Sequence, residues 1–181
     1  MTSRPARVTA YLGLGGNLGD VRTTLATALR ALESDARTES LTCSRLYLTE
    51  PWGMHNQPEF LNLAARIEWR GYPEGLAALC HHLERQAGRD EQREDPNGPR
   101  ELDLDLLLFG DRVIDSPELK VPHPSMHLRR FVLEPLNELA PDLTPPGWEQ
   151  TIYESLETLE DPKWVKALTD APWTAWRRKA G

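Results

Sequence analysis

Residues 98–110, GPRELDLDLLLFG, place two aspartates one residue apart at the start of an apolar run. The run from Leu106 to Phe109 predicts a short buried strand. On a strand, residues i and i+2 point to the same side, so Asp103 and Asp105 share one face. Their Cα atoms should lie roughly 6.5–7 Å apart. Two carboxylates this close repel each other unless a cation lies between them, so the strand end needs either solvent or a positive partner.

A solvent-exposed strand end with two hydrated acids would explain a bare pair of this kind. The surrounding residues favour a metal site instead, because Arg100 directly precedes the strand and Arg89 and Arg93 lie in the same charged loop. Magnesium takes oxygen ligands and is usually held by one or two carboxylates together with substrate phosphates. Arginines beside such a pair are typical of phosphoryl transfer, in which metal and arginine neutralise the phosphate charge.

The order of the predicted elements indicates an α+β fold. Strands are predicted over 7–14, 41–49, 59–69 and 101–109, and helices over about 20–33 and 72–88. The resulting order, β-α-β-β-α-β, is the split βαβ or ferredoxin-like arrangement, an antiparallel sheet with helices packed on its faces. A further helix over 128–139 contains Pro135, which implies a kink or a break.

Residues 1–147 are expected to form this domain. The tryptophan-rich tail 148–181 should be helical, with one or two short helices, and either belong to the domain or pack on it. The chain has 181 residues, a length that suits one domain.

The net charge of −7 excludes non-specific attraction of nucleic acid, so a bound phosphate must be held by local arginines or by metal. Cys43 and Cys80 form no metal-binding spacing and are expected to be buried thiols of a reducing compartment. No apolar run is long enough to span a membrane or resembles a signal peptide. We therefore expect a cytoplasmic protein without a membrane partner. We also expect a monomer, although no feature of the sequence gives the oligomeric state.

The glycine-rich stretch 13–20, GLGGNLGD, follows a strand and precedes a helix, as many phosphate-binding loops do. It does not match G-x-G-x-x-G, because Leu18 stands where the third glycine is required, and it lacks the GK[ST] of a P-loop. A tight turn between strand and helix explains the glycines. Asn17 remains a candidate polar contact to a ligand.

The stretch 49–62, TEPWGMHNQPEFLN, combines aromatic side chains with hydrogen-bonding groups. On a strand, Phe60 and Asn62 would share a face, so a flat heteroaromatic ring could stack on Phe60 while Asn62 binds its edge. Trp52 lies in the same loop. Aromatic side chains that close a loop over the sheet explain this spacing equally well.

Two further candidates lie later in the chain. His123 is flanked by prolines in VPHPSMH, which fix the loop and favour a positioned side chain, and Arg129 begins the following helix, where it could meet a phosphate. A structural histidine and a solvated arginine are the simpler explanations.

Four segments in this order resemble the 6-hydroxymethyl-7,8-dihydropterin pyrophosphokinases of folate biosynthesis. They are YLGLGGNLGD, SRLYLTEPWGMHNQPEFLN, GPRELDLDLLLFGD and VPHPSMHLRRFVLEPLNELAPDL. The resemblance runs from about Thr9 to about Leu143. It implies a ferredoxin-like α+β fold and an enzyme that transfers pyrophosphate from ATP, the co-substrate, to the pterin hydroxymethyl group, with release of AMP.

By motif position, the resemblance also implies a site. Two magnesium ions would be held by Asp103 and Asp105. The pterin pocket would be formed by Asn17, Thr49, Trp52, Phe60, Asn62 and Phe131. ATP and the transferred group would be bound by Glu84, Arg89, Arg100, His123 and Arg129. The catalytic candidates are Arg89, Arg100 and Asp105, the last as a proton acceptor for the hydroxyl group.

The chain departs from the family pattern in one loop. The family usually carries GRxR and an aromatic residue before GPR, whereas this chain has GRDEQREDPNGPR, with Glu91 at the second arginine position and no aromatic residue. Arg93 is the candidate replacement, and the acidic residues of the loop would weaken its attraction for ATP. We expect the loop 89–97 to close over the substrates.

Two other interpretations remain open from the sequence. An inactive pterin- or nucleotide-binding module on the same fold is favoured by the altered loop. A different magnesium-dependent phosphotransferase or nuclease would also use the aspartate pair, but the negative net charge and the stretch 49–62 disfavour it.

Overall fold

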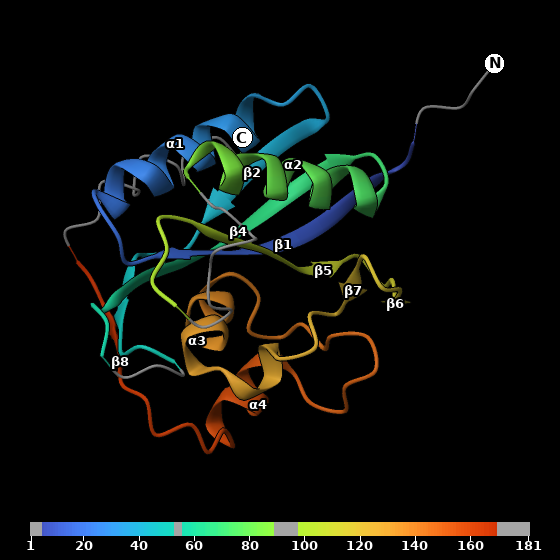
Figure 1. Cartoon of the computed structure of the whole chain (residues 1–181). Coiled ribbons are helices and arrows are strands. Elements are labelled where there is room, and N and C mark those ends of the chain that lie inside the picture. Colours follow the sequence, from blue (N-terminus) through green and yellow to red (C-terminus); the bar gives the residue numbers. More distant parts are fainter. Residues whose placement is uncertain (1–4, 53–55, 89–97, 170–181) are drawn as a thin grey trace.

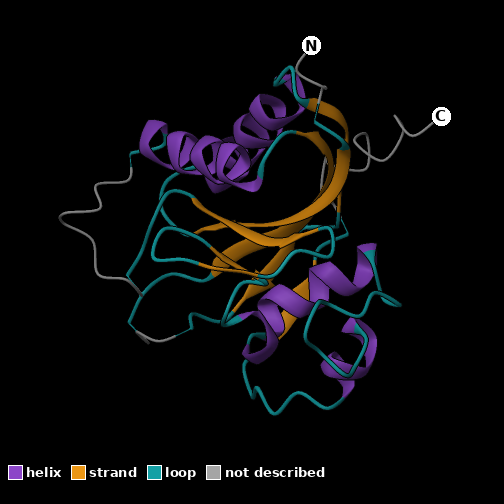
Figure 2. Cartoon of the chain, turned by 90° about the vertical axis from the view of Figure 1, so that its right-hand side faces the viewer, coloured by secondary structure: helices purple, strands orange, loops and turns teal. Residues whose placement is uncertain are grey.

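The computed structural model describes residues 5–52, 56–88 and 98–169. In this part of the chain, helices cover both faces of one sheet (Figure 1). One face carries α1 (Val21–Ser34) and α2 (Pro73–Gln86). The other carries α3 (Arg130–Leu139) and α4 (Ile152–Glu157), as the turned view in Figure 2 also shows. The mixed layers confirm the predicted α+β class.

The main sheet is antiparallel, and β1 (Arg7–Gly16) pairs with β4 (Phe60–Arg70) on one side and β5 (Asp103–Phe109) on the other. The strands beyond β4 are β2 (Thr38–Cys43), β3 (Tyr47–Thr49) and β8 (Val165–Ala167). The short hairpin that follows β5 consists of β6 (Ile114–Asp115) and β7 (Lys120–Val121), and a 3-10 helix, Met126–Leu128, precedes α3. This arrangement is the predicted ferredoxin-like sheet.

Three predicted elements differ from the structure. The strand expected over 41–49 is divided into β2 and β3, because Ser44 donates its backbone N–H to Ala64 and accepts the Ala64 N–H with its own hydroxyl oxygen. A side chain that replaces a backbone partner interrupts the ladder. The described part of the tail, residues 148–169, contains one short helix, α4, and the strand β8, which pairs with β3 and was not predicted. Helix α3 runs through Pro135 without a break.

The core has two parts, one on each face of the sheet. On the α1–α2 side it includes Leu12, Leu14, Leu104 and Leu106, and on the α3–α4 side it includes Leu107 together with residues of both helices. Because Leu104 and Leu106 face α1 and α2, the alternation turns Asp103 and Asp105 toward the α3 face. Cys43 and Cys80 are buried thiols, as predicted.

Three glycines of the stretch 13–20, Gly13, Gly15 and Gly16, lie inside β1 rather than in a turn. Gly15 pairs with Asn62 of β4 and with Asp103 of β5, and a Cβ at this position would collide with the Asn62 side chain. The fourth glycine of the stretch, Gly19, has a positive φ, 67°, and serves the turn. The tight-turn interpretation was therefore wrong for Gly15, which leaves room above the aspartates instead. No helix in the described part of the chain has the length and apolarity needed to cross a bilayer.

Candidate active site

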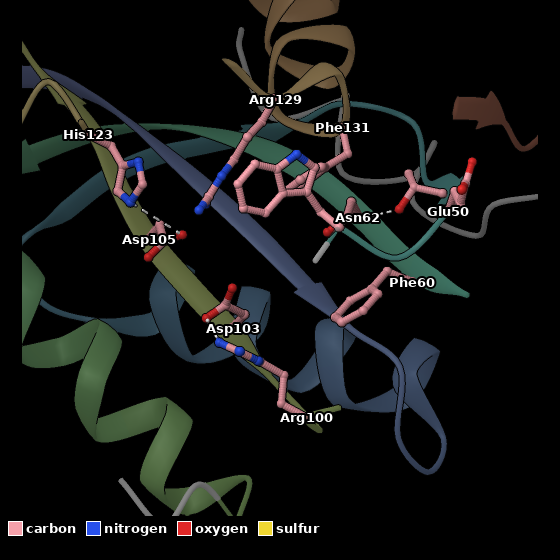
Figure 3. A pocket seen from close by; sticks show the side chains of 11 residues that line it. Glu50, Phe60, Asn62, Arg100, Asp103, Asp105, His123, Arg129 and Phe131 are labelled. Carbon is pink, nitrogen blue, oxygen red and sulfur yellow. Dashed lines mark hydrogen bonds and ion pairs between the residues drawn. The ribbon is translucent and has the colours of Figure 1, made fainter. Parts of the chain in front are cut away.

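A cavity of about 200 Å³ opens on the α3 side of the sheet, above the start of β5 (Figure 3). Its walls come from the ends of β3 and β4, from β5, and from the loop and helix start that follow β7. The lining residues are Thr49, Glu50, Trp52, Phe60, Asn62, Arg100, Asp103, Asp105, His123, Arg129 and Phe131. Glu50 is the one lining residue that the sequence did not predict. Of the predicted site residues that the structure describes, all but Asn17 and Glu84 thus meet in one place.

The acidic wall of this cavity belongs to β5. Asp103 and Asp105 are paired across the sheet with Gly15 and Gly13, so no side chain of β1 shields them. Arg100 donates from Nη1 to Asp103 Oδ1 at 3.0 Å, and its own side chain is 9% exposed. Within the chain, an arginine is therefore the counter-charge for the first aspartate, and both carboxylates remain about one-third exposed.

His123 stands beside the second aspartate. The Ser125 backbone N–H donates to His123 Nδ1 at 3.3 Å, so the neutral ring carries its proton on Nε2, which lies 3.9 Å from Asp105 Oδ2. Burial lowers the pKa of His123, and the nearby Arg129 guanidinium lowers it further, against an opposing effect of Asp103. The ring is therefore neutral at pH 7 and offers a hydrogen-bond donor rather than a charge.

The opposite wall is aromatic, with a buried polar floor. Phe60 comes from the start of β4 and Phe131 from the start of α3. Between them, Asn62 donates from Nδ2 to Thr49 Oγ1 at 2.7 Å, and both polar residues are buried. A flat ring with hydrogen-bonding edges suits such a wall, because its faces can stack while its edges bind amide and hydroxyl groups.

Arg129 lies at the boundary between the two walls. Its Cζ is 4.7 Å from the ring centre of Trp52 and 5.8 Å from that of Phe131. Its Nε is buried and has no hydrogen-bond partner among the described residues. A guanidinium held by aromatic faces keeps its directional donors for an anion such as a phosphate.

Asn17 does not line the cavity. Its side chain joins two neighbouring segments: Nδ2 donates to the Pro58 carbonyl (2.9 Å) and to Gln57 Oε1 (3.1 Å), and Oδ1 accepts the Arg100 backbone N–H (2.9 Å). Asn17 is 7% exposed. Its geometry is that of a residue that fixes the positions of cavity-lining neighbours.

Glu84 lies on the other face of β5, on α2. Its Oε1 accepts the Leu104 backbone N–H at 2.8 Å, and its Oε2 is 3.2 Å from His81 Nδ1. Leu104 separates the two aspartates, so Glu84 holds the backbone of the strand that carries them. Arg89 and Arg93, with the rest of the loop 89–97, lie outside the described residues, as does any closure of that loop.

A second cavity, of about 260 Å³, lies between α2 and the β6–β7 hairpin. Its lining residues are Ala77, Cys80, His81, Leu104, Asp105, Leu106, Pro117, Glu118, Leu119, Lys120, His123 and Pro124. Asp105 and His123 belong to both cavities. Burial, with the nearby Glu84 and Asp105 carboxylates, raises the pKa of the Cys80 thiol far above its usual range. The segment 117–120 carries no recognisable motif, so the sequence could not have predicted this cavity.

The donor set at β5 fits magnesium bound together with a phosphate ligand. Among the residues that the structure describes, no three histidine, cysteine, aspartate or glutamate side chains are placed to hold a metal ion. Two carboxylates on one strand face nevertheless supply the one or two protein ligands that magnesium usually takes, since water and substrate phosphates complete its shell.

Comparison with known proteins gives a consistent result. Residues 11–141 match the model of the family 7,8-dihydro-6-hydroxymethylpterin-pyrophosphokinase (HPPK). The chain is 38% identical over 159 residues to the 2-amino-4-hydroxy-6-hydroxymethyldihydropteridine pyrophosphokinase of Haemophilus influenzae, covering 88% of this chain and 98% of that protein. It is 43% identical over 136 residues to the protein of the same name from Pseudomonas aeruginosa, covering 75% and 83%.

Among solved structures, the HPPK-DHPS A437G protein of Plasmodium falciparum, in a crystal structure with SDX-DHP, superposes with a TM-score of 0.70 at 16% identity. The match covers 86% of this chain and 46% of the solved chain, so this chain spans less than half of that protein. At this identity, the likeness supports the fold alone.

Proposed function

The chain belongs to the 7,8-dihydro-6-hydroxymethylpterin-pyrophosphokinase family. From this premise we propose which of its residues bind the pterin, which bind ATP and which take part in the transfer. The enzyme transfers pyrophosphate from ATP to the hydroxymethyl group of 6-hydroxymethyl-7,8-dihydropterin, giving the pterin diphosphate and AMP in folate biosynthesis. Family membership excludes the unrelated phosphotransferase or nuclease that the aspartate pair alone would allow.

One observation carries the assignment of sites: the aromatic cavity and the second cavity share Asp105 and His123. A two-substrate transfer requires two binding sites that meet where the phosphorus atom is exchanged. We assign the aromatic cavity to the pterin and the cavity beside α2 to the adenosine side of ATP. The triphosphate then lies along the shared boundary.

In the pterin cavity, the ring stacks on Phe60 and Phe131, while the Asn62 amide and the Thr49 hydroxyl bind its polar edge. This arrangement directs the hydroxymethyl group toward β5. Trp52 closes the cavity on the side where Arg129 lies. Asn17 contributes by holding the loop before β4 and the Arg100 segment in place.

On the nucleotide side, Arg100, Arg129 and His123 bind phosphate oxygens, and Arg89 joins them from outside the described residues. Glu84 contributes indirectly, through its hydrogen bond to the Leu104 backbone. Asp103 and Asp105 hold magnesium, and we propose two ions. Magnesium held by these two carboxylates would supply positive charge to neutralise the phosphates.

In the transfer, the pterin hydroxyl oxygen attacks the β-phosphorus in line, and the bond from that phosphorus to the α–β bridging oxygen breaks. AMP leaves with the bridging oxygen, and the hydroxyl proton passes to Asp105. Arg100 and Arg129 stabilise the negative charge that develops on the phosphate oxygens. Stacking of the pterin orients the hydroxyl group and lowers the entropic cost of the step.

Titration calorimetry on two variants tests this division. Asn62→Ala should weaken pterin binding while leaving magnesium-dependent binding of a non-hydrolysable ATP analogue intact. Asp105→Ala should do the reverse. If both variants lost both ligands equally without unfolding, or if neither lost any, the division into two sites would be wrong. The monomeric state and the cytoplasmic location remain predictions; light scattering tests the former.

A further inference from the structure

Residues 159–164 connect α4 to β8 and follow the stretch 11–141 that matches the family model. In Figure 1 this segment runs from α4 toward β8. Within the described part of the chain, it makes hydrogen bonds to Arg130, the neighbour of Phe131, and to the lining residue Glu50, although none of its own residues lines the aromatic cavity.

The first contact is at the start of α3. The Arg130 backbone N–H donates to Asp161 Oδ2 at 2.9 Å, while the Arg130 side chain donates to the carbonyl oxygens of Asp161 and Leu159 at 3.3 and 3.2 Å. The residue before the helix gives no side-chain cap. A carboxylate from another segment therefore caps α3, where it also meets the positive end of the helix dipole. Arg130 lies between the cavity residues Arg129 and Phe131.

The second contact is at the end of β3. Lys163 Nζ forms an ion pair with Glu50 Oε1 at 2.8 Å, and the Glu50 backbone N–H donates to the Trp164 carbonyl at 3.2 Å. The Lys163 side chain is only 18% exposed, so this pair is better shielded than an ordinary surface pair. Figure 3 shows the Glu50 carboxylate turned away from Asp103 and Asp105.

One carboxylate joins the two contacts. Asp161 Oδ1 accepts the Lys163 backbone N–H at 3.0 Å, while its Oδ2 caps α3. We propose that residues 159–164 form a clamp that fixes the spacing between Thr49 in the polar floor and Phe131 in the aromatic wall, with Asp161 and Lys163 as positioning residues for the pterin. The proposal rests on the assignment of the pterin to this cavity.

The clamp acts on the width of the pterin cavity and leaves the nucleotide cavity unchanged. A ring that must stack on the aromatic side chains while it hydrogen-bonds the polar floor tolerates little change in the spacing between them. Lys163→Met removes the charge and keeps the apolar stem. We expect it to raise the KM for the pterin about tenfold, with the KM for ATP and kcat changed less than about twofold.

Matched variants separate positioning from general destabilisation. Lys163→Arg keeps the ion pair and should restore a near wild-type KM for the pterin. Lys166→Met removes an exposed lysine from β8 and should have no effect. If Lys163→Met does not fold, Glu50→Gln removes the same ion pair from the other side. Steady-state kinetics with each substrate varied in turn, alongside thermal unfolding, provides the readout.

A rise in the KM for the pterin alone, rescued by Lys163→Arg, would support the clamp. An unchanged KM for the pterin in Lys163→Met, or a fall in kcat alone, would overturn it. The Asn62→Ala variant distinguishes this failure from failure of the site itself. If Asn62→Ala raises the KM for the pterin and Lys163→Met does not, the cavity assignment holds and the clamp is wrong; if neither does, both are wrong.

Discussion

In the described part of the chain, two arginines lie over tryptophan rings, and they differ in what else they contact. Arg37 has its Cζ 4.5 Å from the ring centre of Trp69, and Arg129 lies 4.7 Å from that of Trp52. Arg37 also donates two hydrogen bonds to Asp35, at 2.9 and 2.8 Å. Arg129 has a buried Nε without a hydrogen-bond partner among the described residues.

The difference separates a structural arginine from a ligand-binding one. Trp69, near the end of β4, is fully buried, whereas Trp52 is 36% exposed at the cavity. At the Trp69 end, a carboxylate already neutralises the guanidinium, so the group supports the fold. At the cavity, the aromatic rings hold the guanidinium and leave its directional donors for phosphate. Hydrogen-bond partners, rather than the stacking itself, therefore distinguish the two.

The largest difference is expected between variants of two aspartates, Asp105 at the cavity and Asp35 beside Arg37. Asp105→Ala should lower turnover about a thousandfold or more, because it removes a metal ligand and the proposed proton acceptor. Asp35→Ala should keep turnover within about twofold and lower only the stability. Assays of AMP release, with circular dichroism as a check on folding, compare the two. An unaltered rate in Asp105→Ala would refute the metal assignment.

The arginines themselves give the next largest effect. Arg129→Ala should lower kcat/KM about a hundredfold with little loss of stability, since it removes a phosphate contact. Arg37→Ala should leave kcat/KM unchanged and cost about 1 kcal/mol of unfolding free energy. Urea denaturation measures the unfolding free energy of both variants, and steady-state kinetics measures their kcat/KM. If Arg129→Ala reduced the stability and left kcat/KM unchanged, Arg129 would be a structural residue like Arg37, and the distinction between the two arginines would be wrong.

A smaller effect concerns pH. The hydrogen bond from Arg37 lowers the pKa of Asp35 below its ordinary value of 3.8. The resulting stabilisation is fully present above that value and is lost as the pH falls through the lowered pKa of the folded state. The stability difference between wild type and Arg37→Ala should therefore be larger at pH 7 than at pH 2.5. Urea midpoints at both pH values test this, and a difference that grew on acidification would contradict it.

The sequence correctly predicted which side chains share a strand face, because this depends only on the alternation of residues along one strand. The i, i+2 spacing of Asp103 and Asp105, and of Phe60 and Asn62, correctly placed each pair on one strand face toward one cavity. The order of the main helices and strands along the chain also followed, because the helical and strand periods are encoded within each segment.

Contacts between segments far apart in the sequence could not be predicted in this way, because they depend on how the segments pair in the fold. The role of Gly15 depends on the register of β1 against both neighbours, and the contacts of Asn17 join segments 40 and 83 residues away. β8 was missed because it is only three residues long, too short for its alternation to stand out, and it forms a strand only by pairing with β3. The clamp has the same origin, since Asp161 and Lys163 carry no motif.

The most direct test of the central claim is the identity of the products. The protein is incubated with magnesium, ATP and 6-hydroxymethyl-7,8-dihydropterin, and AMP is resolved from ADP. A cavity that aligns the hydroxyl group with the β-phosphorus predicts AMP and pterin diphosphate in equal amounts. ADP with a pterin monophosphate, or binding of both substrates without any AMP, would contradict it.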